Sequence, residues 1–430
     1  MNIQKPIINE SNRIYKEAKK IIPYQTQTLS KAPFNYVEGV SPKYLKKGKG
    51  CYVWDVDGNK YIDYGMALGP IVLGYCYDKV DDAIREQLND AINLTLMHPL
   101  ELEVSKLLVD VIPCAEMVRF GKNGSDVTTA AIRLARAYTG RDLVVCCGYH
   151  GWQDWYAATL PLNAGIPDDI RKLTIKFNYN DINSLKKILE KNGDEVSCVI
   201  IEPSTADLPK ENFLEKAKEL CHKKGAVFIL DEIKTGFRIA LGGAQEYFGV
   251  IPDIATYGKA MGNGMPISAI VGKKEIMQHM NDIFFSFTSA GELLSLAAAK
   301  ATINELISKN VINEMSKIGS NLMTKYNKVL KDVGLETKMI FKGMNNYNVL
   351  TFSDPKKAEI YKSLLIQEMA KRGILFGGYN IMCFSHDQED INSSIQAFSE
   401  SASLLSAWIK EGRFEEKLEG IVSRPVFKRY

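Results

Sequence analysis

Lys259 and Asp231 are the residues of this 430-residue chain whose types and surroundings best match catalytic chemistry. Lys259 lies in the glycine-rich stretch Ala255–Pro266, and Asp231 directly follows the apolar run Val227–Leu230. An aldehyde cofactor needs an amine that holds it as a Schiff base, and a pyridine ring accepts electrons when an anion keeps its nitrogen protonated. The pair therefore predicts pyridoxal phosphate as the cofactor, with Lys259 as the amine and Asp231 as the anion.

Each of these two residues also has an ordinary interpretation. Most lysines are solvated surface charges, and an acid that follows an apolar strand is often a helix cap or part of an ion pair. The surroundings favour a site, because Val227–Leu230 is typical of a buried parallel strand and open α/β sheets bind ligands at the carboxyl ends of their strands. The glycines around Lys259 indicate an irregular segment whose backbone can approach a flat ring closely.

A turn before a helix provides a candidate phosphate site. Met117–Phe120 is predicted to be a strand, Gly121–Ser125 a turn, and the chain from Asp126 onward a helix. Free amides at the helix start and the Ser125 hydroxyl would bind an anion, although an ordinary capped turn fits these residues equally well. The glycine spacing and the Lys-Ser/Thr pair that define Walker loops and dinucleotide fingerprints are missing from this turn.

The elements that must position these residues indicate an α/β fold with a large, mostly parallel sheet. Cys198–Ile201 is followed by a helical pattern from Phe213 to Cys221 and then by another apolar run, Ala226–Leu230, which is the strand–helix–strand order of such a sheet. We expect residues 76–315 to form this large cofactor-binding domain. Residues 316–430 are expected to form a smaller α+β domain, which the N-terminal segment 1–75, with a hairpin between Cys51 and Tyr64, would join.

Charge and composition restrict the class of partner and the compartment. The net charge is +3, from 54 basic and 51 acidic residues, and there is no block of like charge, so neither nucleic acid nor a membrane surface is indicated as a partner. The eight cysteines include no Cys-x-x-Cys pair and are interpreted as reduced core residues. No apolar run approaches the roughly 20 residues of a membrane span, and the first residues lack the apolar core of a signal peptide. We expect a cytoplasmic protein.

The chain resembles the class III aminotransferases among the fold-type I pyridoxal phosphate enzymes, and within them the branch that contains glutamate-1-semialdehyde aminomutase. The resemblance runs from about Leu29 to the C-terminal region. The segments that carry it are Gly48–Asn59, Leu100–Val104, Ile132–Arg141, Gly148–Gly151, Glu202–Pro203, Asp231–Arg238, Gly242–Gly249 and the Lys259 stretch.

The resemblance implies a role for each matching residue. Lys259 would form the Schiff base and Asp231 would pair with the ring nitrogen. Tyr149 would stack on one face of the ring, and Ile233 would cover the other face. Gly124 and Ser125 would bind the phosphate.

Three further residues are less settled. Thr288 matches a threonine that reaches the phosphate from the neighbouring subunit, which implies a homodimer with shared active sites. Glu202 would lie near the cofactor, and a buried ion pair fits it equally well. His150 has no partner that the sequence reveals, and we interpret it as a structural residue or one that supports the site from behind.

Departures from the aminomutase pattern favour an aminotransferase that acts on another substrate. The turn Lys122–Asp126 keeps a glycine and a hydroxyl, but Asp207 stands where the mutase has an asparagine that contacts the ring hydroxyl. Leu29–Tyr36 has no arginine where the mutase binds its substrate carboxylate. We therefore expect transfer of an amino group from a small amino donor to an aldehyde or keto acceptor, with ping-pong kinetics. An aminomutase, an epimerase, a decarboxylase and a non-catalytic ligand sensor would use the same cofactor residues and remain alternatives.

Overall fold

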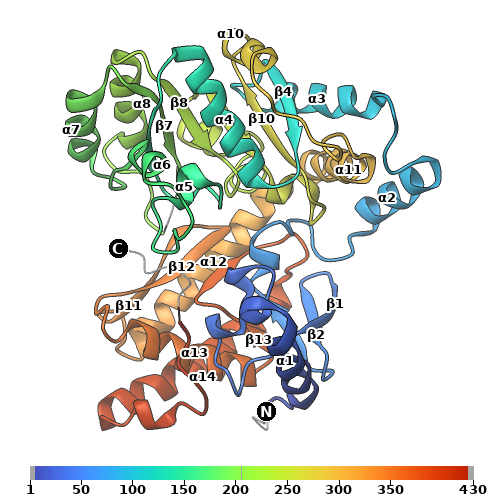
Figure 1. Cartoon of the computed structure of the whole chain (residues 1–430). Helices are drawn as coiled ribbons and strands as arrows, with labels where there is room; N and C mark the ends of the chain where they lie inside the picture. The colour runs from blue at the N-terminus through green and yellow to red at the C-terminus, as the bar shows by residue number, and fades with distance from the viewer. Residues whose placement is uncertain (1–4, 205, 425–430) are drawn as a thin grey trace. The chain divides into compact units, whose positions relative to one another are not determined.

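The computed structural model describes residues 5–204 and 206–424 of the chain. The chain divides into two compact units (Figure 1). One unit combines Met1–Tyr77 with Asn313–Tyr430, and the other consists of Asp78–Ile312. Within the described part of the chain, every helix falls short of the length or the apolar character that crossing a bilayer requires.

The unit of Asp78–Ile312 is built on a seven-stranded sheet with the strand order β4-β10-β9-β8-β7-β5-β6. The strands are β4 (Met117–Gly121), β5 (Leu143–Cys147), β6 (Thr174–Lys176), β7 (Val196–Ile201), β8 (Val227–Asp231), β9 (Ile254–Tyr257) and β10 (Ser268–Gly272). All neighbours from β6 to β9 pair in parallel, whereas β10 is antiparallel to both β4 and β9. The predicted α/β fold with a mostly parallel sheet is confirmed.

Helices cover both faces of this sheet, which explains why its strands are continuous apolar runs. In β8, Val227 and Ile229 belong to the core shared with α4, while Phe228 and Leu230 belong to the core shared with α7 and α8. Alternate residues of a strand point to opposite faces, so a strand that is covered twice must be apolar at every position. The helices of this unit are α2 (Asp78–Asp90), α3 (Pro99–Val111), α4 (Gly124–Thr139), α5 (Asp154–Ala157), α6 (Asp168–Lys172), α7 (Ile182–Asn192), α8 (Phe213–Lys223), α9 (Ala244–Phe248), η5 (Lys259–Gly262), α10 (Lys274–Met277), η6 (Gln278–Asn281) and α11 (Leu293–Ser308).

The other unit contains two smaller sheets. One has the order β1-β2-β3-β13 and the other β11-β12-β14. The strands are β1 (Leu45–Lys49), β2 (Tyr52–Asp55), β3 (Lys60–Asp63), β11 (Met339–Met344), β12 (Tyr347–Phe352), β13 (Ile374–Leu375) and β14 (Tyr379–Ile381), and the long helices are α1 (Asn9–Ile21), α12 (Val311–Asp332), α13 (Ala358–Lys371) and α14 (Gln388–Glu411). β2 and β3 form the predicted hairpin, and β13 adds to β3 in parallel through Ile374 and Ile62. The first and last parts of the chain therefore share one sheet.

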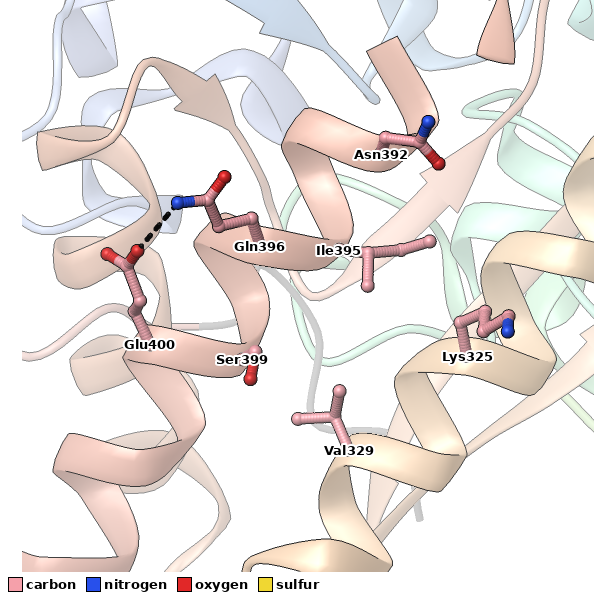
Figure 2. Close-up of a pocket in the computed structure, with 7 residues that line it drawn as sticks. All are labelled: Lys325, Val329, Asn392, Ile395, Gln396, Ser399 and Glu400. Carbon is pink, nitrogen blue, oxygen red and sulfur yellow. Dashed lines mark hydrogen bonds between the residues drawn. The ribbon is translucent and has the colours of Figure 1, made fainter. Parts of the chain in front are cut away.

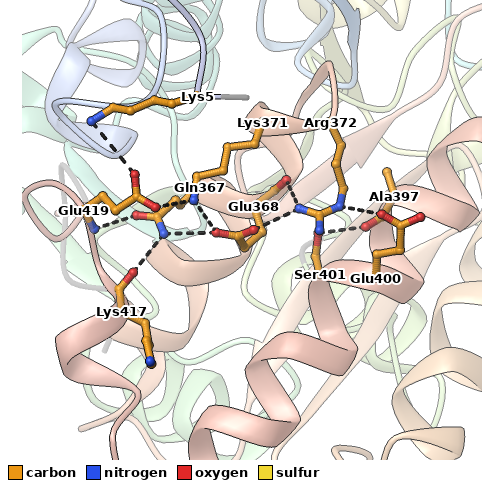
Figure 3. Close-up of polar contacts among 10 residues, drawn as sticks. All are labelled: Lys5, Gln367, Glu368, Lys371, Arg372, Ala397, Glu400, Ser401, Lys417 and Glu419. Atoms are coloured by element: carbon orange, nitrogen blue, oxygen red, sulfur yellow. Dashed lines mark hydrogen bonds and ion pairs between the residues drawn. The ribbon is translucent and has the colours of Figure 1, made fainter. Parts of the chain in front are cut away.

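A polar network ties α13 to α14 and to the chain after α14 (Figure 3). Arg372 donates to the Glu368 carboxylate at 2.9 Å and to Glu400 at 3.0 Å, and Lys371 pairs with both Glu368 and Glu419. The side chains of Arg372 and Glu368 are nearly buried. Because a buried charge is tolerated only with partners, each of these residues depends on the others being present.

The cysteines are all unpaired, as the sequence predicts, and seven of them are buried. Cys76 is exposed, so the interpretation of all eight as core residues is wrong at that position.

Candidate active site

Four neighbouring parallel strands bring most of the predicted residues to one edge of the sheet. Tyr149 follows β5, Glu202 follows β7, Asp231 ends β8, and Lys259 comes two residues after β9. The register pairs Asp231 of β8 with Thr256 of β9, so Lys259 lies three residues beyond the partner of Asp231. Since the carboxyl ends of parallel strands meet at the same edge, the amine and the anion converge there.

Asp231 is buried and forms a close pair with His150. The Nδ1 atom of His150 lies 2.7 Å from Oδ2 of Asp231, and its Nε2 atom lies 3.1 Å from the carbonyl oxygen of Cys147. A carbonyl oxygen only accepts hydrogen bonds, and so does an ionised carboxylate. Both ring nitrogens of His150 thus face acceptor atoms, and the two contacts fix the ring against the Asp231 carboxylate. The other oxygen, Oδ1, accepts from the amide of Ile233 at 3.2 Å and the Thr256 hydroxyl at 3.3 Å.

Lys259 occupies a strained backbone position, with φ at +43°. A positive φ is unusual for a residue with a side chain, and such strain is concentrated at functional sites. Burial lowers the pKa of Lys259, and the nearby Lys234 ammonium lowers it further, while the carboxylates of Glu202 and Asp231 oppose the shift. A lowered pKa favours the neutral amine, which is the nucleophilic form.

Glu202 forms an ion pair that the sequence did not reveal. Its Oε1 atom lies 2.5 Å from the ammonium of Lys234, and its Oε2 atom accepts from the amide of Tyr149 at 3.2 Å. Burial raises the pKa of Glu202, but the charge and hydrogen bond of Lys234, together with other nearby basic groups, more than offset this, and the pKa falls below its ordinary value. The Tyr149 ring is half exposed and stands edge-on to Tyr156, with centroids 5.6 Å apart.

The predicted phosphate turn leads directly into α4, which starts at Gly124, two residues before the predicted start at Asp126. The carboxylate of Asp126 accepts from the amides of Lys122 and Asn123 at 3.1 and 2.7 Å and so closes the turn. The amides of Gly124 and Ser125 lie in the first turn of α4, where no carbonyl group of the helix can accept from them. They therefore remain available to an anion. The Ser125 hydroxyl accepts from the amide of Trp152 at 3.3 Å.

Glycines leave narrow spaces between these elements. A Cβ atom on Gly151 would lie 2.3 Å from the Ser125 hydroxyl oxygen, and one on Gly148 would lie 2.4 Å from Cβ of Glu202. A Cβ on Gly124 or on Gly258 would approach the side chain of Ile233 to 3.3 or 3.2 Å. Ile233 therefore lies between the start of α4 and the residue before Lys259.

Together these residues fit pyridoxal phosphate. They supply an amine with a lowered pKa, a buried carboxyl group and a helix start whose amides can bind an anion. A metal ion has no comparable site, because residues 5–204 and 206–424 contain no cluster of three His, Cys, Asp or Glu side chains suited to bind one.

Thr288 does not join this group within one chain. It is exposed in the irregular segment 283–292 before α11, and its carbonyl oxygen accepts from the Asn93 side chain at 3.2 Å. Among the described residues, no hydrogen bond connects Thr288 with Gly124 or Ser125.

Two hollows of similar size lie elsewhere on the surface. One, of about 420 Å³, lies between α4 and the segment 283–292 and includes Lys122, Arg133, Phe285 and Phe287 in its lining. The other, of about 430 Å³, lies between α12 and α14 (Figure 2), where Gln396 donates to Glu400 at 3.1 Å. Neither lining includes a predicted site residue, although the first hollow adjoins the phosphate turn through Lys122 and Asn123.

Comparison with known proteins gives consistent matches along the chain. The model of the family aminotransferase class III matches residues 36–384. A 3-aminobutyryl-CoA aminotransferase of Cloacimonas acidaminovorans is 37% identical over 404 residues, which cover 91% of this chain and 96% of that protein. A glutamate-1-semialdehyde 2,1-aminomutase of Sulfurihydrogenibium is 33% identical over 437 residues, with 94% and 100% covered.

Solved structures share the fold at lower sequence identity. The pyridoxal phosphate form of the FumI protein of Sphingopyxis superimposes with a TM-score of 0.88 at 24% identity and covers 93% of this chain and 97% of that chain. A glutamate-1-semialdehyde aminomutase of Pseudomonas aeruginosa gives a TM-score of 0.80 at 21% identity, with 92% and 94% covered.

Proposed function

The chain belongs to the class III aminotransferases, which are pyridoxal phosphate enzymes, and from this membership we propose that it transfers an amino group from a small amino donor to an aldehyde or keto acceptor. The observation that carries the proposal is the placement of Lys259 and Asp231 at the ends of adjacent parallel strands. When bound, the cofactor supplies an electron sink for charge that develops on the substrate.

We assign proton transfer to Lys259. Its lowered pKa favours the neutral amine, which would hold the cofactor aldehyde and, when free, would take the proton from the donor's Cα. Burial is the main cause of this lowered pKa, and the Lys234 ammonium adds to it, while Glu202, which pairs with Lys234, opposes it. Because donor and acceptor use the same site in turn, the kinetics should be ping-pong.

We assign to Asp231 the role of keeping the ring nitrogen protonated, and to His150 the role of holding Asp231 in place. The His150 ring contacts Oδ2 at 2.7 Å and so orients the carboxylate, which would pair with a protonated ring nitrogen. His150 is itself fixed by the Cys147 carbonyl.

The remaining assignments concern binding. Gly124 and Ser125 would hold the phosphate at the start of α4, with Tyr149 on one face of the ring and Ile233 on the other. The contacts of Ile233 with Gly124 and Gly258 support its place beside the ring.

We further propose a homodimer in which Thr288 binds the phosphate in the neighbouring subunit. Exposed apolar side chains next to the Thr288 segment support an interface: Phe284 is 79% exposed, and Leu96 and Met97, which follow Asn93, are 77% and 81% exposed. Side chains of this kind are typical of a surface that another chain covers.

A cytoplasmic location is supported by the eight unpaired cysteines, because disulfides are rare in that compartment.

An amino-donor and acceptor screen on the purified protein tests the reaction. An aminotransferase releases a keto product from the donor, whereas an aminomutase rearranges one substrate without releasing such a product. The resemblance to aminomutases keeps that reaction as the alternative, and the missing arginine in Leu29–Tyr36 favours transamination. Isomerisation of glutamate-1-semialdehyde without a released keto product would refute the proposal.

A further inference from the structure

The segment 283–292, which carries Thr288, has little structure of its own. It contains neither helix nor strand, and its internal backbone bonds are those of a short turn, from Ala290 to Phe287 and from Glu292 to Ser289. Ile283 and Phe285 pack against the core that includes α4, and Phe285 and Phe287 line the hollow of about 420 Å³ beside that helix. Polar contacts add to this packing and help to determine the path of the segment.

Basic side chains from β4, the phosphate turn and α4 hold both ends of the segment. Arg133 of α4 donates to the carbonyl oxygen of Phe284 at 2.6 Å, and Arg119 of β4 donates to that of Phe285 at 3.1 Å. At the other end, Lys122 pairs with Glu292 at 2.7 Å, and both of these side chains are only 14% exposed.

Glu292 also connects the segment to the next helix. Its carboxylate accepts from the amides of Leu294 and Ser295 at 2.8 and 3.3 Å and caps α11. Thr288 thus lies between two anchored points, and the anchors belong to the strand, turn and helix that form the same chain's phosphate site.

We propose that Arg119, Lys122 and Arg133 are positioning residues that hold the segment 283–292 in the path that presents Thr288 to the partner subunit. This role rests on the proposed sharing of Thr288 between subunits. Hydrogen bonds from charged donors to carbonyl oxygens fix direction as well as distance, which suits a segment that must reach into another chain. The phosphate turn of each chain and the Thr288 that it presents to the neighbouring site would then be held rigidly together.

The test compares Arg133→Met with Arg136→Met in the cofactor-loaded enzyme. Arg136 lies on the same helix and donates to a carbonyl oxygen, that of Asp142 at 2.8 Å, but does not contact the segment, so it is a matched control. Hydrogen–deuterium exchange of the peptide 283–292 should become roughly fivefold faster in Arg133→Met, the equivalent of one hydrogen bond of about 1 kcal/mol. Arg136→Met should leave this exchange unchanged, and Arg133→Lys should restore part of the protection.

Cofactor dissociation shows whether the effect passes through Thr288. Arg133→Met should accelerate dissociation, and it should add nothing in a Thr288→Ala background. Unchanged exchange in Arg133→Met, or additive effects of the two substitutions on dissociation, would overturn the positioning role. Unchanged dissociation in Thr288→Ala alone would instead overturn the shared site on which this role rests. Failure of the shared site is thus detected in Thr288→Ala, and failure of the positioning role in Arg133→Met.

Discussion

Replacing Asp231 with asparagine tests the electron-sink assignment with little change in shape. Asparagine keeps one acceptor and replaces the other oxygen with an amide that donates. His150 can adapt, because loss of its Nδ1 proton lets that nitrogen accept from the new amide while Nε2 still donates to Cys147. One charge-assisted hydrogen bond becomes a neutral one, which costs about 1–2 kcal/mol of folding stability. The fold and cofactor binding should therefore survive.

Turnover should fall far more than stability. An amide carries no negative charge that would keep the ring nitrogen protonated, so the transition state loses the stabilisation that a protonated ring provides. A loss of about 4 kcal/mol, the upper range for one electrostatic group in an active site, corresponds to roughly a 10³-fold decrease in kcat. The assay is the rate of the donor half-reaction, followed by cofactor absorbance at saturating donor.

Asp253 provides the matched control. It is also buried and also pairs with a histidine, His222, at 2.8 Å, but it precedes β9 and so lies at the opposite edge of the sheet from Asp231. Asp253→Asn should reduce stability, because the carboxylate also accepts from Lys273 and the amide of Phe228, and should leave kcat per folded enzyme unchanged. Near-normal turnover in Asp231→Asn, or an equal loss in both variants, would mean that Asp231 is a structural carboxylate.

Other outcomes follow from the same structure. Borohydride treatment of the yellow holoenzyme should fix the cofactor on Lys259, and recovery of the label on a different lysine by mass spectrometry would remove that assignment. Mixing inactive Lys259→Ala chains with inactive Thr288→Arg chains should restore activity, because one site of the mixed dimer receives both intact residues; no rescue after demonstrated subunit exchange would exclude sharing. Burial lowers the pKa of His386 from 6.5 to about 4, so the unfolded chain binds a proton before the native chain does, and stability should fall by about 3 kcal/mol as the pH drops across that interval. Urea unfolding of His386→Gln should show a weaker pH dependence, and an unchanged slope would contradict this account.

The sequence predicts the strands of the large sheet well, because burial on both faces leaves a strong pattern. Cys198–Ile201 and Val227–Leu230 lie within β7 and β8, and Met117–Phe120 lies within β4. The antiparallel placement of β10 between β4 and β9 was not predicted, since Ser268–Gly272 has the same apolar composition that a parallel strand would have.

The polar pairs between residues far apart in the chain could not be predicted from the sequence. His150 and Asp231 are 81 residues apart, and Glu202 and Lys234 are 32 apart, so no local spacing indicates either contact. Strand order decides both pairs, because β7 lies between β5 and β8 at the edge where these residues meet. His150 and Glu202 therefore find their partners, Asp231 and Lys234, only in the folded sheet.

The pairing of Asp231 with Thr256 also determines where this chain can tolerate changes in length. The connection between β8 and β9 runs over α9, and adding residues to such a connection costs little, because doubling a flexible loop costs only about 0.6 kcal/mol. An added residue between Thr256 and Lys259 would instead move the amine by about 3.3 Å, more than a hydrogen bond can absorb. The number of residues that separate Asp231 from Lys259 can therefore change, while the distance of each residue from its paired strand end cannot. Insertions meant to alter this enzyme without disabling it belong in the connection around α9.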